Sequence, residues 1–182
     1  DEVRLEFRVV NETGRRISIN PILCMTLTGS AQLNKQEDME DTRLVLDGEI
    51  VGLRRLTPTP EQKGRTPLYM INVKGGKPFV PLGEDFPPGG GVFWYADQQA
   101  DVPLLFRVTR DRHHLVAISF PNCTDYILYN GGIPCLHAGP TKSTDVDIGA
   151  EFVWRGVIYA MRNDSAELLR RYRTIEATLN TD

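Results

Sequence analysis

Short stretches in which apolar and charged residues alternate, separated by turn signals, constrain the fold of this sequence more than any other feature. In the segment VRLEFRVV, residues 3–10, almost every second residue is apolar and the residues between them are charged. This period of two predicts a β-strand with one face on a core and the other in water. A second strand is predicted after the turn NETGRR and is interrupted at Pro21. The two strands are predicted to pair as an opening hairpin.

The segment RLVLDGEIVGL, residues 43–53, carries the clearest local signal in the chain. Asp47 and Gly48 lie between two apolar runs, which is the pattern of a hairpin with a two-residue type I′ turn. The hairpin places Leu44 opposite Val51. Further strands are predicted at 68–73, 92–95, 104–110, 115–120, 126–129 and 152–161.

A single helix is predicted at the C-terminal end, over residues 164–179. Asp164 and Glu167 have the spacing of a capping box, in which an N-cap acceptor is followed three residues later by a carboxylate. An apolar stripe follows at helical spacing and consists of Leu168, Tyr172, Ile175 and Leu179. A stripe of this kind needs a partner, and the sheet of the same domain is the expected one.

Many short strands followed by one helix predict a mainly all-β protein. The expected fold is an antiparallel, immunoglobulin-like β-sandwich or a distorted barrel, with the C-terminal helix docked on it. Residues 1–182 are predicted to form one domain, with strands from about 3 to 161, because the sequence contains no internal repeat and no linker.

Composition excludes several classes of function. The net charge of −3 and the absence of a broad basic segment argue against a nucleic-acid partner. No apolar run approaches the length of a transmembrane segment. A chain that starts at Asp1 and enters a strand at once is typical of an exported protein after removal of a targeting segment, and of a fragment. Glycosylation sequons at Asn11, Asn122 and Asn163 also suggest a secreted, periplasmic or cell-surface location.

The three cysteines allow two interpretations. A turn at 130–132 would bring Cys135 back towards Cys123, which predicts a disulfide between them and leaves Cys24 as a buried free thiol. The alternative is a metal site in which Cys123, Cys135 and His137 are the ligands. No other cofactor is predicted.

Other chemistry-bearing residues form weaker patterns. His113 and His114 are adjacent, so at most one of them can serve a given metal site, and an exposed turn suits both. A cysteine nucleophile would need Cys135 and His137 to meet, and strand alternation alone does not imply that geometry.

Acid–base or calcium chemistry would draw on Asp145, Asp147 and Glu151, where the first two share a face at strand spacing. A solvent-facing Trp94 or Tyr95 would suit a carbohydrate or a protein partner.

These patterns favour a non-enzymatic, exported binding module that presents sandwich loops to a protein or carbohydrate partner. Its binding candidates are Trp94, Tyr95, His113, His114 and His137. Two alternatives stay open. One is a metal-binding domain built on His137 with Cys123 and Cys135. The other is a hydrolase that uses the three carboxylates at positions 145, 147 and 151.

Overall fold

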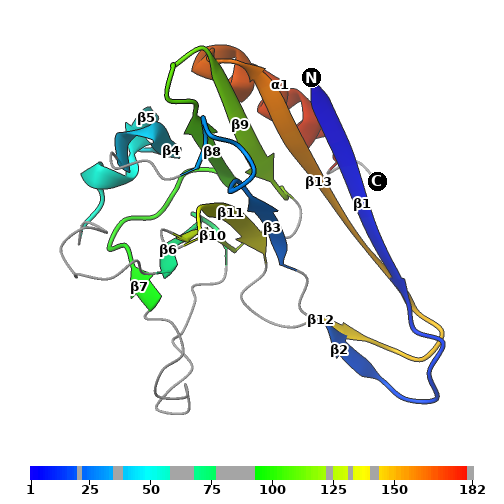
Figure 1. Cartoon of the computed structure of the whole chain (residues 1–182). Helices are drawn as coiled ribbons and strands as arrows, with labels where there is room; N and C mark the ends of the chain where they lie inside the picture. The colour runs from blue at the N-terminus through cyan, green and yellow to red at the C-terminus, as the bar shows by residue number, and fades with distance from the viewer. Residues whose placement is uncertain are drawn as a thin grey trace.

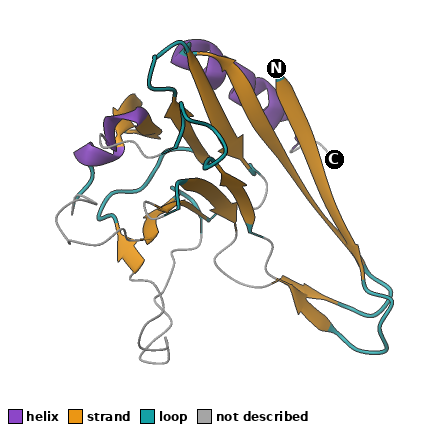
Figure 2. Cartoon of the chain, in the orientation of Figure 1, coloured by secondary structure: helices purple, strands orange, loops and turns teal. Residues whose placement is uncertain are grey.

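The structure is a computed structural model, and the residues it describes are 1–19, 22–34, 39–57, 68–76, 93–121, 125–130, 133–139 and 144–179. These residues contain thirteen strands, one α-helix and two single 3-10 turns, η1 (Met39–Asp41) and η2 (Leu53–Arg55). The protein is therefore mostly β with one C-terminal helix, as the sequence predicts (Figure 2).

Two sheets make up most of the molecule (Figure 1). The larger sheet has the strand order β1 (Glu2–Val10), β13 (Glu151–Arg162), β9 (His114–Ser119), β8 (Leu104–Val108), β4 (Thr42–Leu46), β5 (Glu49–Gly52). The smaller sheet has the order β3 (Leu23–Thr26), β11 (Cys135–Gly139), β10 (Tyr126–Asn130), β6 (Leu68–Asn72), β7 (Phe93–Tyr95). A separate short ribbon pairs β12 (Thr144–Val146) with β2 (Ile17–Ile19). These pairings are antiparallel except that of β6 with β7, which is parallel.

The main core lies between the two sheets. Leu105 and Ile118 from the larger sheet join Ile71, Ile127 and Leu136 from the smaller sheet in one buried cluster. This is a sandwich arrangement, in which alternate residues of facing strands fill the space between the sheets. The two sheets establish the sandwich. The immunoglobulin-like connectivity expected from the sequence stays a prediction.

A single buried arginine links the two sheets. Arg107 on β8 is fully buried, and its Nη1 donates to the Tyr129 hydroxyl on β10 at 3.1 Å. The guanidinium also lies 5.6 Å from the centroid of the Tyr129 ring. Aromatic faces attract cations at such distances, so this contact ties the sheets together inside the core.

The helix α1 (Ser165–Leu179) covers the other face of the larger sheet. Leu168, Tyr172 and Ile175 are buried against a cluster that includes Val157 and Tyr159 of β13. The predicted docking of the apolar stripe on the sheet is therefore confirmed for these three residues. The side chain of the fourth, Leu179, lies outside the described part.

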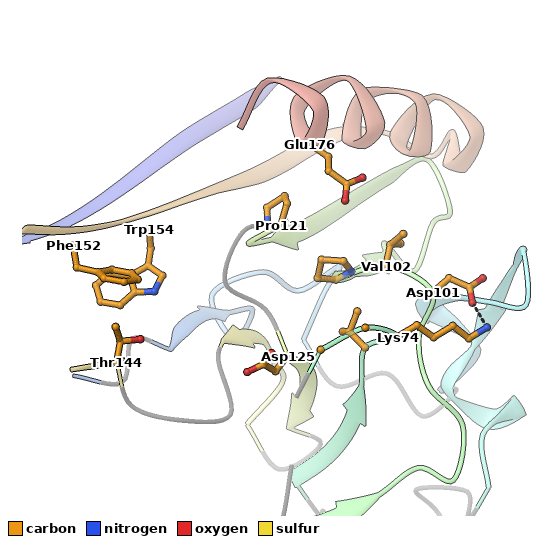
Figure 3. Close-up of a pocket in the computed structure, with 13 residues that line it drawn as sticks. Lys74, Asp101, Val102, Pro121, Asp125, Thr144, Phe152, Trp154 and Glu176 are labelled. Atoms are coloured by element: carbon orange, nitrogen blue, oxygen red, sulfur yellow. Dashed lines mark ion pairs between the residues drawn. The ribbon is translucent and has the colours of Figure 1, made fainter. Parts of the chain in front are cut away.

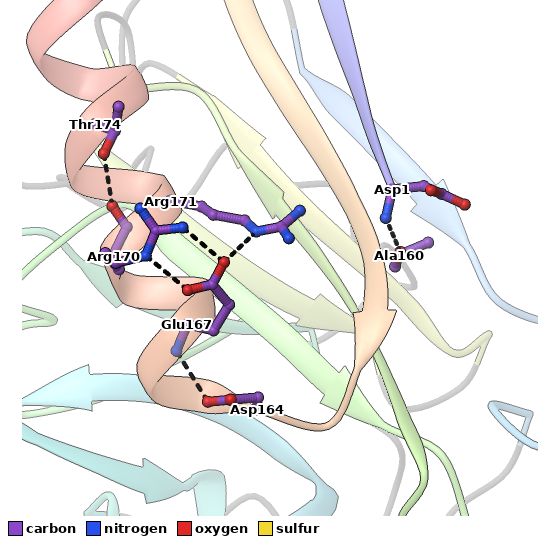
Figure 4. Close-up of polar contacts among 7 residues, drawn as sticks. All are labelled: Asp1, Ala160, Asp164, Glu167, Arg170, Arg171 and Thr174. Carbon is purple, nitrogen blue, oxygen red and sulfur yellow. Dashed lines mark hydrogen bonds and ion pairs between the residues drawn. The ribbon is translucent and has the colours of Figure 1, made fainter.

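The start of α1 is capped as the sequence predicts, but only by half of a capping box (Figure 4). The Asp164 carboxylate accepts a hydrogen bond from the Glu167 backbone N–H at 2.9 Å. The Glu167 carboxylate binds the guanidinium groups of Arg170 and Arg171. In a complete capping box it would instead accept the backbone N–H of Asp164. Hydrogen bonds first from Arg170 and then from Arg171 lower the pKa of Glu167 to about 2.

The hairpin predicted at Asp47 and Gly48 is confirmed, with Leu44 opposite Val51. Both turn residues have positive φ, 52° and 81°, as a type I′ turn requires.

The predicted opening hairpin is wrong. Strand β1 pairs with β13, β2 with β12 and β3 with β11, so none of the first strands pairs with its neighbour in sequence. An alternating strand can satisfy its two faces with any antiparallel partner, and its pattern does not say which one.

The sequon at Asn11 does not support glycosylation in this fold. The Asn11 side chain is fully buried, and its Nδ2 donates both to the Arg15 carbonyl at 2.9 Å and to the Val146 carbonyl at 2.8 Å. A glycan replaces one of these amide hydrogens, so the folded chain has no room for it. Asn122 lies outside the described residues, and the Asn163 amide donates to the Arg112 carbonyl.

Replacement of Leu168 by Ala is expected to lower the free energy of unfolding by about 2–5 kcal/mol, because it leaves a cavity between α1 and the sheet. Leu168 is completely buried there. Arg173→Ala on the exposed side of the same helix is the matched control and should change stability by less than about 0.5 kcal/mol. Urea unfolding measures both. Equal effects of the two changes would contradict the docking of α1.

Replacement of Gly48 by Ala is expected to cost about 1–2 kcal/mol, because an L-residue disfavours the φ of 81° at this turn. Gly14→Ala is the control. Both glycines have open space where a Cβ would stand, but Gly14 is not among the glycines with positive φ. Thermal unfolding of the two variants therefore isolates the backbone effect, and equal stabilities would contradict the type I′ turn.

Candidate metal centre

Two neighbouring strands of the smaller sheet bring together a thiol–imidazole group made of Cys24, Cys135 and His137. Cys24 lies on the edge strand β3, and the other two lie on β11. The register places His137 directly opposite Cys24 and Cys135 opposite Thr26. Residues two apart on a strand share a face, so all three side chains stand on the face turned away from the inter-sheet core.

The three ligand atoms converge on one small volume. The Cys135 Sγ lies 2.8 Å from His137 Nε2, and the Cys24 Sγ lies 3.7 Å from the same nitrogen. All three atoms lie within 4.8 Å of one another. The described residues contain no other cluster of three such ligand groups.

The solvent exposure of the thiol–imidazole group differs from one side to the other. Cys24 is exposed, His137 is half-buried and Cys135 is buried, with 3% of its surface exposed. Beside them on the same face of the sheet lies an apolar cluster that includes Met70 and Leu128, and Leu128 stands opposite His137 on β10. A site at such a boundary can be reached from solvent and still shields its innermost ligand.

Burial controls the protonation of the two inner ligands. Desolvation raises the pKa of the Cys135 thiol to about 12, with a smaller contribution from the neighbouring Cys24. Desolvation also lowers the pKa of His137, so its imidazole is neutral at physiological pH. A neutral imidazole is the form that binds a metal ion, whereas the thiol must first lose its proton.

Two polar neighbours can support the sulfur atoms. The side chain of Asn130 forms a hydrogen bond with Cys135 that favours the thiolate, and its Oδ1 accepts the Ile133 backbone N–H. The Thr26 hydroxyl lies 3.6 Å from the Cys24 Sγ. Hydrogen bonds from such outer neighbours orient and tune metal ligands.

The dimensions of the group fit a small thiophilic ion. Zinc binds sulfur at about 2.3 Å and imidazole nitrogen at about 2.0–2.1 Å, so sulfur and nitrogen ligands of a tetrahedral ion lie about 3.6 Å apart. The Cys24–His137 distance already has this value. The Cys135–His137 distance would have to open by about 0.8 Å, which a side-chain rotation can supply.

A disulfide within the group fits less well. Cys24 and Cys135 are diagonal neighbours across the two strands, and the structure describes both as free thiols. Diagonal residues are separated by more than the Cα distance that a disulfide spans, and an ion held by bonds of about 2.3 Å bridges the gap. The predicted disulfide partner Cys123 lies outside the described residues, so that pairing stays a prediction.

The remaining predicted site residues do not join this group. His113 and His114 are exposed at the turn between β8 and β9, as expected of a turn pair. Trp94 and Tyr95 lie on β7, and their side chains are outside the described part.

The three carboxylates are held by arginines. The Arg16 guanidinium lies 2.6 Å from Asp147 and 3.8 Å from Asp145, and Arg8 lies 3.1 Å from Glu151. All of these pairs are exposed to solvent. The hydrolase interpretation built on these carboxylates stays a prediction.

A pocket of about 450 Å³ lies elsewhere, between α1 and the ends of both sheets (Figure 3). At one end, Lys74 Nζ binds Asp101 at 2.6 Å and Asp47 at 3.0 Å, which anchors the β4–β5 turn. At the other end, Trp154 is buried and packs on Phe152 with ring centroids 4.2 Å apart. Trp154 also packs on Phe7 of β1, with ring centroids 5.4 Å apart.

No protein-family model, curated protein or solved structure matches this chain. Function therefore has to be inferred from the chemistry of the site itself.

Sequence reasoning found two of the three members of the thiol–imidazole group and missed Cys24. It assigned Cys24 to a buried position, and the structure shows that it is exposed. The available signal was the pattern of the segment around it. Cys24 alternates with Leu23 and Met25, which pack on the core, so it had to point the other way.

Proposed function

We propose that this protein is a non-enzymatic binding domain whose ligand is a thiophilic metal ion, Zn(II) or Cu(I). The observation that carries the proposal is the convergence of two thiols and one imidazole nitrogen within 4.8 Å. Thiolate and imidazole donors select these ions over magnesium or calcium, which prefer oxygen ligands. Three protein ligands suit trigonal Cu(I), or zinc with one further ligand.

An enzymatic thiol is the closest competing function, because Cys135 and His137 do meet. A nucleophilic cysteine needs a lowered thiol pKa and access for its substrate. Cys135 has the opposite properties, since it is buried and its pKa is raised to about 12. A metal ion can lower that pKa by binding the thiolate directly, so ligation is the chemistry that this environment favours.

The first test is metal binding by the purified, reduced protein. Wild-type protein should bind about one equivalent of Co(II), used as a spectroscopic probe for zinc, with a thiolate-to-metal charge-transfer band, and Zn(II) should displace the probe. The variants Cys24→Ser, Cys135→Ser and His137→Ala should each weaken binding at least about tenfold, because each removes one ligand. A parallel titration with Cu(I) and a competing chelator distinguishes the two ions.

Cys123→Ser is the matched control, because it removes the one cysteine that is not a member of the proposed ligand set. It should leave Co(II) affinity unchanged. Loss of binding in this variant would instead support the ligand set of Cys123, Cys135 and His137 expected from the sequence. Wild-type protein that binds neither Zn(II) nor Cu(I), although its thiols are reduced, would contradict the proposal.

Metal affinity should depend strongly on pH. Since the raised pKa keeps the Cys135 thiol protonated at neutral pH, the ion must displace its proton. The apparent affinity should therefore rise about tenfold per pH unit from this ligand alone, between about pH 6 and about pH 8. Above about pH 7 His137 adds no dependence, because burial lowers its pKa from the ordinary value and its imidazole is neutral there. Chelator competition at several pH values measures the slope, and a flat profile would contradict ligation by Cys135.

The location and the partner belong to the same proposal. No helix among the described residues combines the length and the apolar character needed to cross a membrane. A Cys123–Cys135 disulfide would support the exported module that presents loops to a protein or carbohydrate partner, since disulfides persist in oxidising compartments. Three alkylatable thiols in the unfolded, unreduced protein would support the metal centre and a reducing compartment. Counting those thiols by mass spectrometry distinguishes the two.

A further inference from the structure

The strand β1 forms one edge of the larger sheet, and within the described residues its only strand partner is β13 (Figure 1). Asp1 and Ala160 exchange two backbone hydrogen bonds across this pair, and the Asn11 N–H donates to the Ala150 carbonyl. In an antiparallel pair such bonds fall on alternate residues. The odd residues of β1 therefore bond to β13, and the even residues turn their N–H and C=O groups to the free edge.

The side chains of β1 suit a partner at this edge. Glu2, Arg4, Glu6 and Arg8 alternate in charge along one face. On the other face, Val3 is 56% exposed and Phe7 is 49% exposed. An unpaired edge with exposed apolar residues is a ready template for another strand.

We propose that β1 pairs with the β1 of a second copy of this chain, antiparallel and centred on Leu5. In this register Arg4 faces Glu6 of the second copy and Glu2 faces Arg8, so that all four charged pairs are of opposite sign. Val3 faces Phe7, which covers the exposed apolar residues of both copies. Opposite charges and apolar pairs directly across two strands are the contacts that stabilise a sheet.

The hydrogen-bonding pattern of the free edge is independently compatible with this register. Directly opposed residues in an antiparallel pair either both bond or both do not. Centred on Leu5, each outward-facing even residue meets another even residue, so the free N–H and C=O groups of both strands can bond to each other. The two larger sheets would then continue as one.

Neighbouring registers are disfavoured by charge. A pairing centred on Glu6 places Arg4 opposite Arg8 and Glu6 opposite itself. A pairing centred on Arg4 places Glu2 opposite Glu6 and Arg4 opposite itself. Like charges directly opposite destabilise a strand pair. Registers centred on Val3 or Phe7 also pair opposite charges, but each forms two such pairs, whereas the register at Leu5 forms four and is therefore favoured.

The ion pairs already present within one copy do not compete strongly with charge pairing between two copies of β1. Arg4 binds Glu2 at 3.3 Å and Arg8 binds Glu6 at 3.1 Å. Arg8 also binds Glu151 at 3.1 Å, and Arg155 binds Glu6 at 3.3 Å. All of these side chains are at least 30% exposed. Exposed pairs of this kind contribute little to stability and can be shared with a second carboxylate or guanidinium. A strand protected against pairing carries charges that repel a copy of itself, whereas this strand carries charges that match one.

The test uses a pair of charge reversals, Arg4→Glu and Glu6→Arg. Wild-type protein should sediment as a dimer at high concentration, and each variant alone should dimerise at least about tenfold more weakly, because like charges then face each other. An equimolar mixture of the two variants should recover the dimer, since the carboxylate introduced in one chain then faces the guanidinium introduced in the other. Analytical ultracentrifugation of all four samples measures this.

Arg15→Glu is the control, because it makes the same charge change on an exposed loop residue outside β1. It should dimerise as wild type does. Recovery in the mixture also shows that both variants are folded, although Glu6→Arg loses its contact with Arg155. The proposal is overturned if wild type stays monomeric at its highest soluble concentration, if either reversal dimerises like wild type, or if the mixture stays monomeric.

Discussion

The middle of strand β13 is buried on both faces, and the other layers of the molecule are arranged around it. Val157 and Tyr159 point towards α1, while Trp154 points towards the smaller sheet. The ring of Phe120 occupies the space that a side chain at Gly156 would need. Because β13 also pairs with β1 and β9, one strand of twelve residues connects the helix, both sheets and the N-terminal edge.

Features with a local cause could be predicted from the sequence. The turn at Asp47 and Gly48 needs two residues with positive φ, and the start of α1 needs an acceptor such as Asp164. Most of the longer strands with alternating or β-branched residues could be predicted as well, whereas the three-residue strand β12 could not. Strand β11 could not be predicted either, because CLHAG contains no β-branched residue and its small residues resemble a turn. Its place in the sheet comes from the partners on both sides, β10 and β3.

The pairing of strands and the complete site could not be predicted for a related reason. Cys24 and His137 are 113 residues apart in the chain, and they meet only because β3 and β11 pair in one register. Moving that register by one residue would turn Cys24 to the opposite face of the sheet. Sequence patterns show which residues share a face of one strand, as Cys135 and His137 do. They do not show which residue of a distant strand stands beside them.

If Cys24 binds a metal ion as proposed, its position on an edge strand couples ion binding to the opening of that strand. Strand β3 has four residues and one neighbour within the smaller sheet, so it has few backbone bonds to hold it there. Edge segments with few contacts are the first parts of a fold to open. An ion bound by both Cys24 and β11 would cross-link the two strands, so that opening β3 would require the bond between the ion and Cys24 to break. Amide hydrogen exchange of β3 would consequently report the metal content of its surroundings, even though its backbone binds no ion.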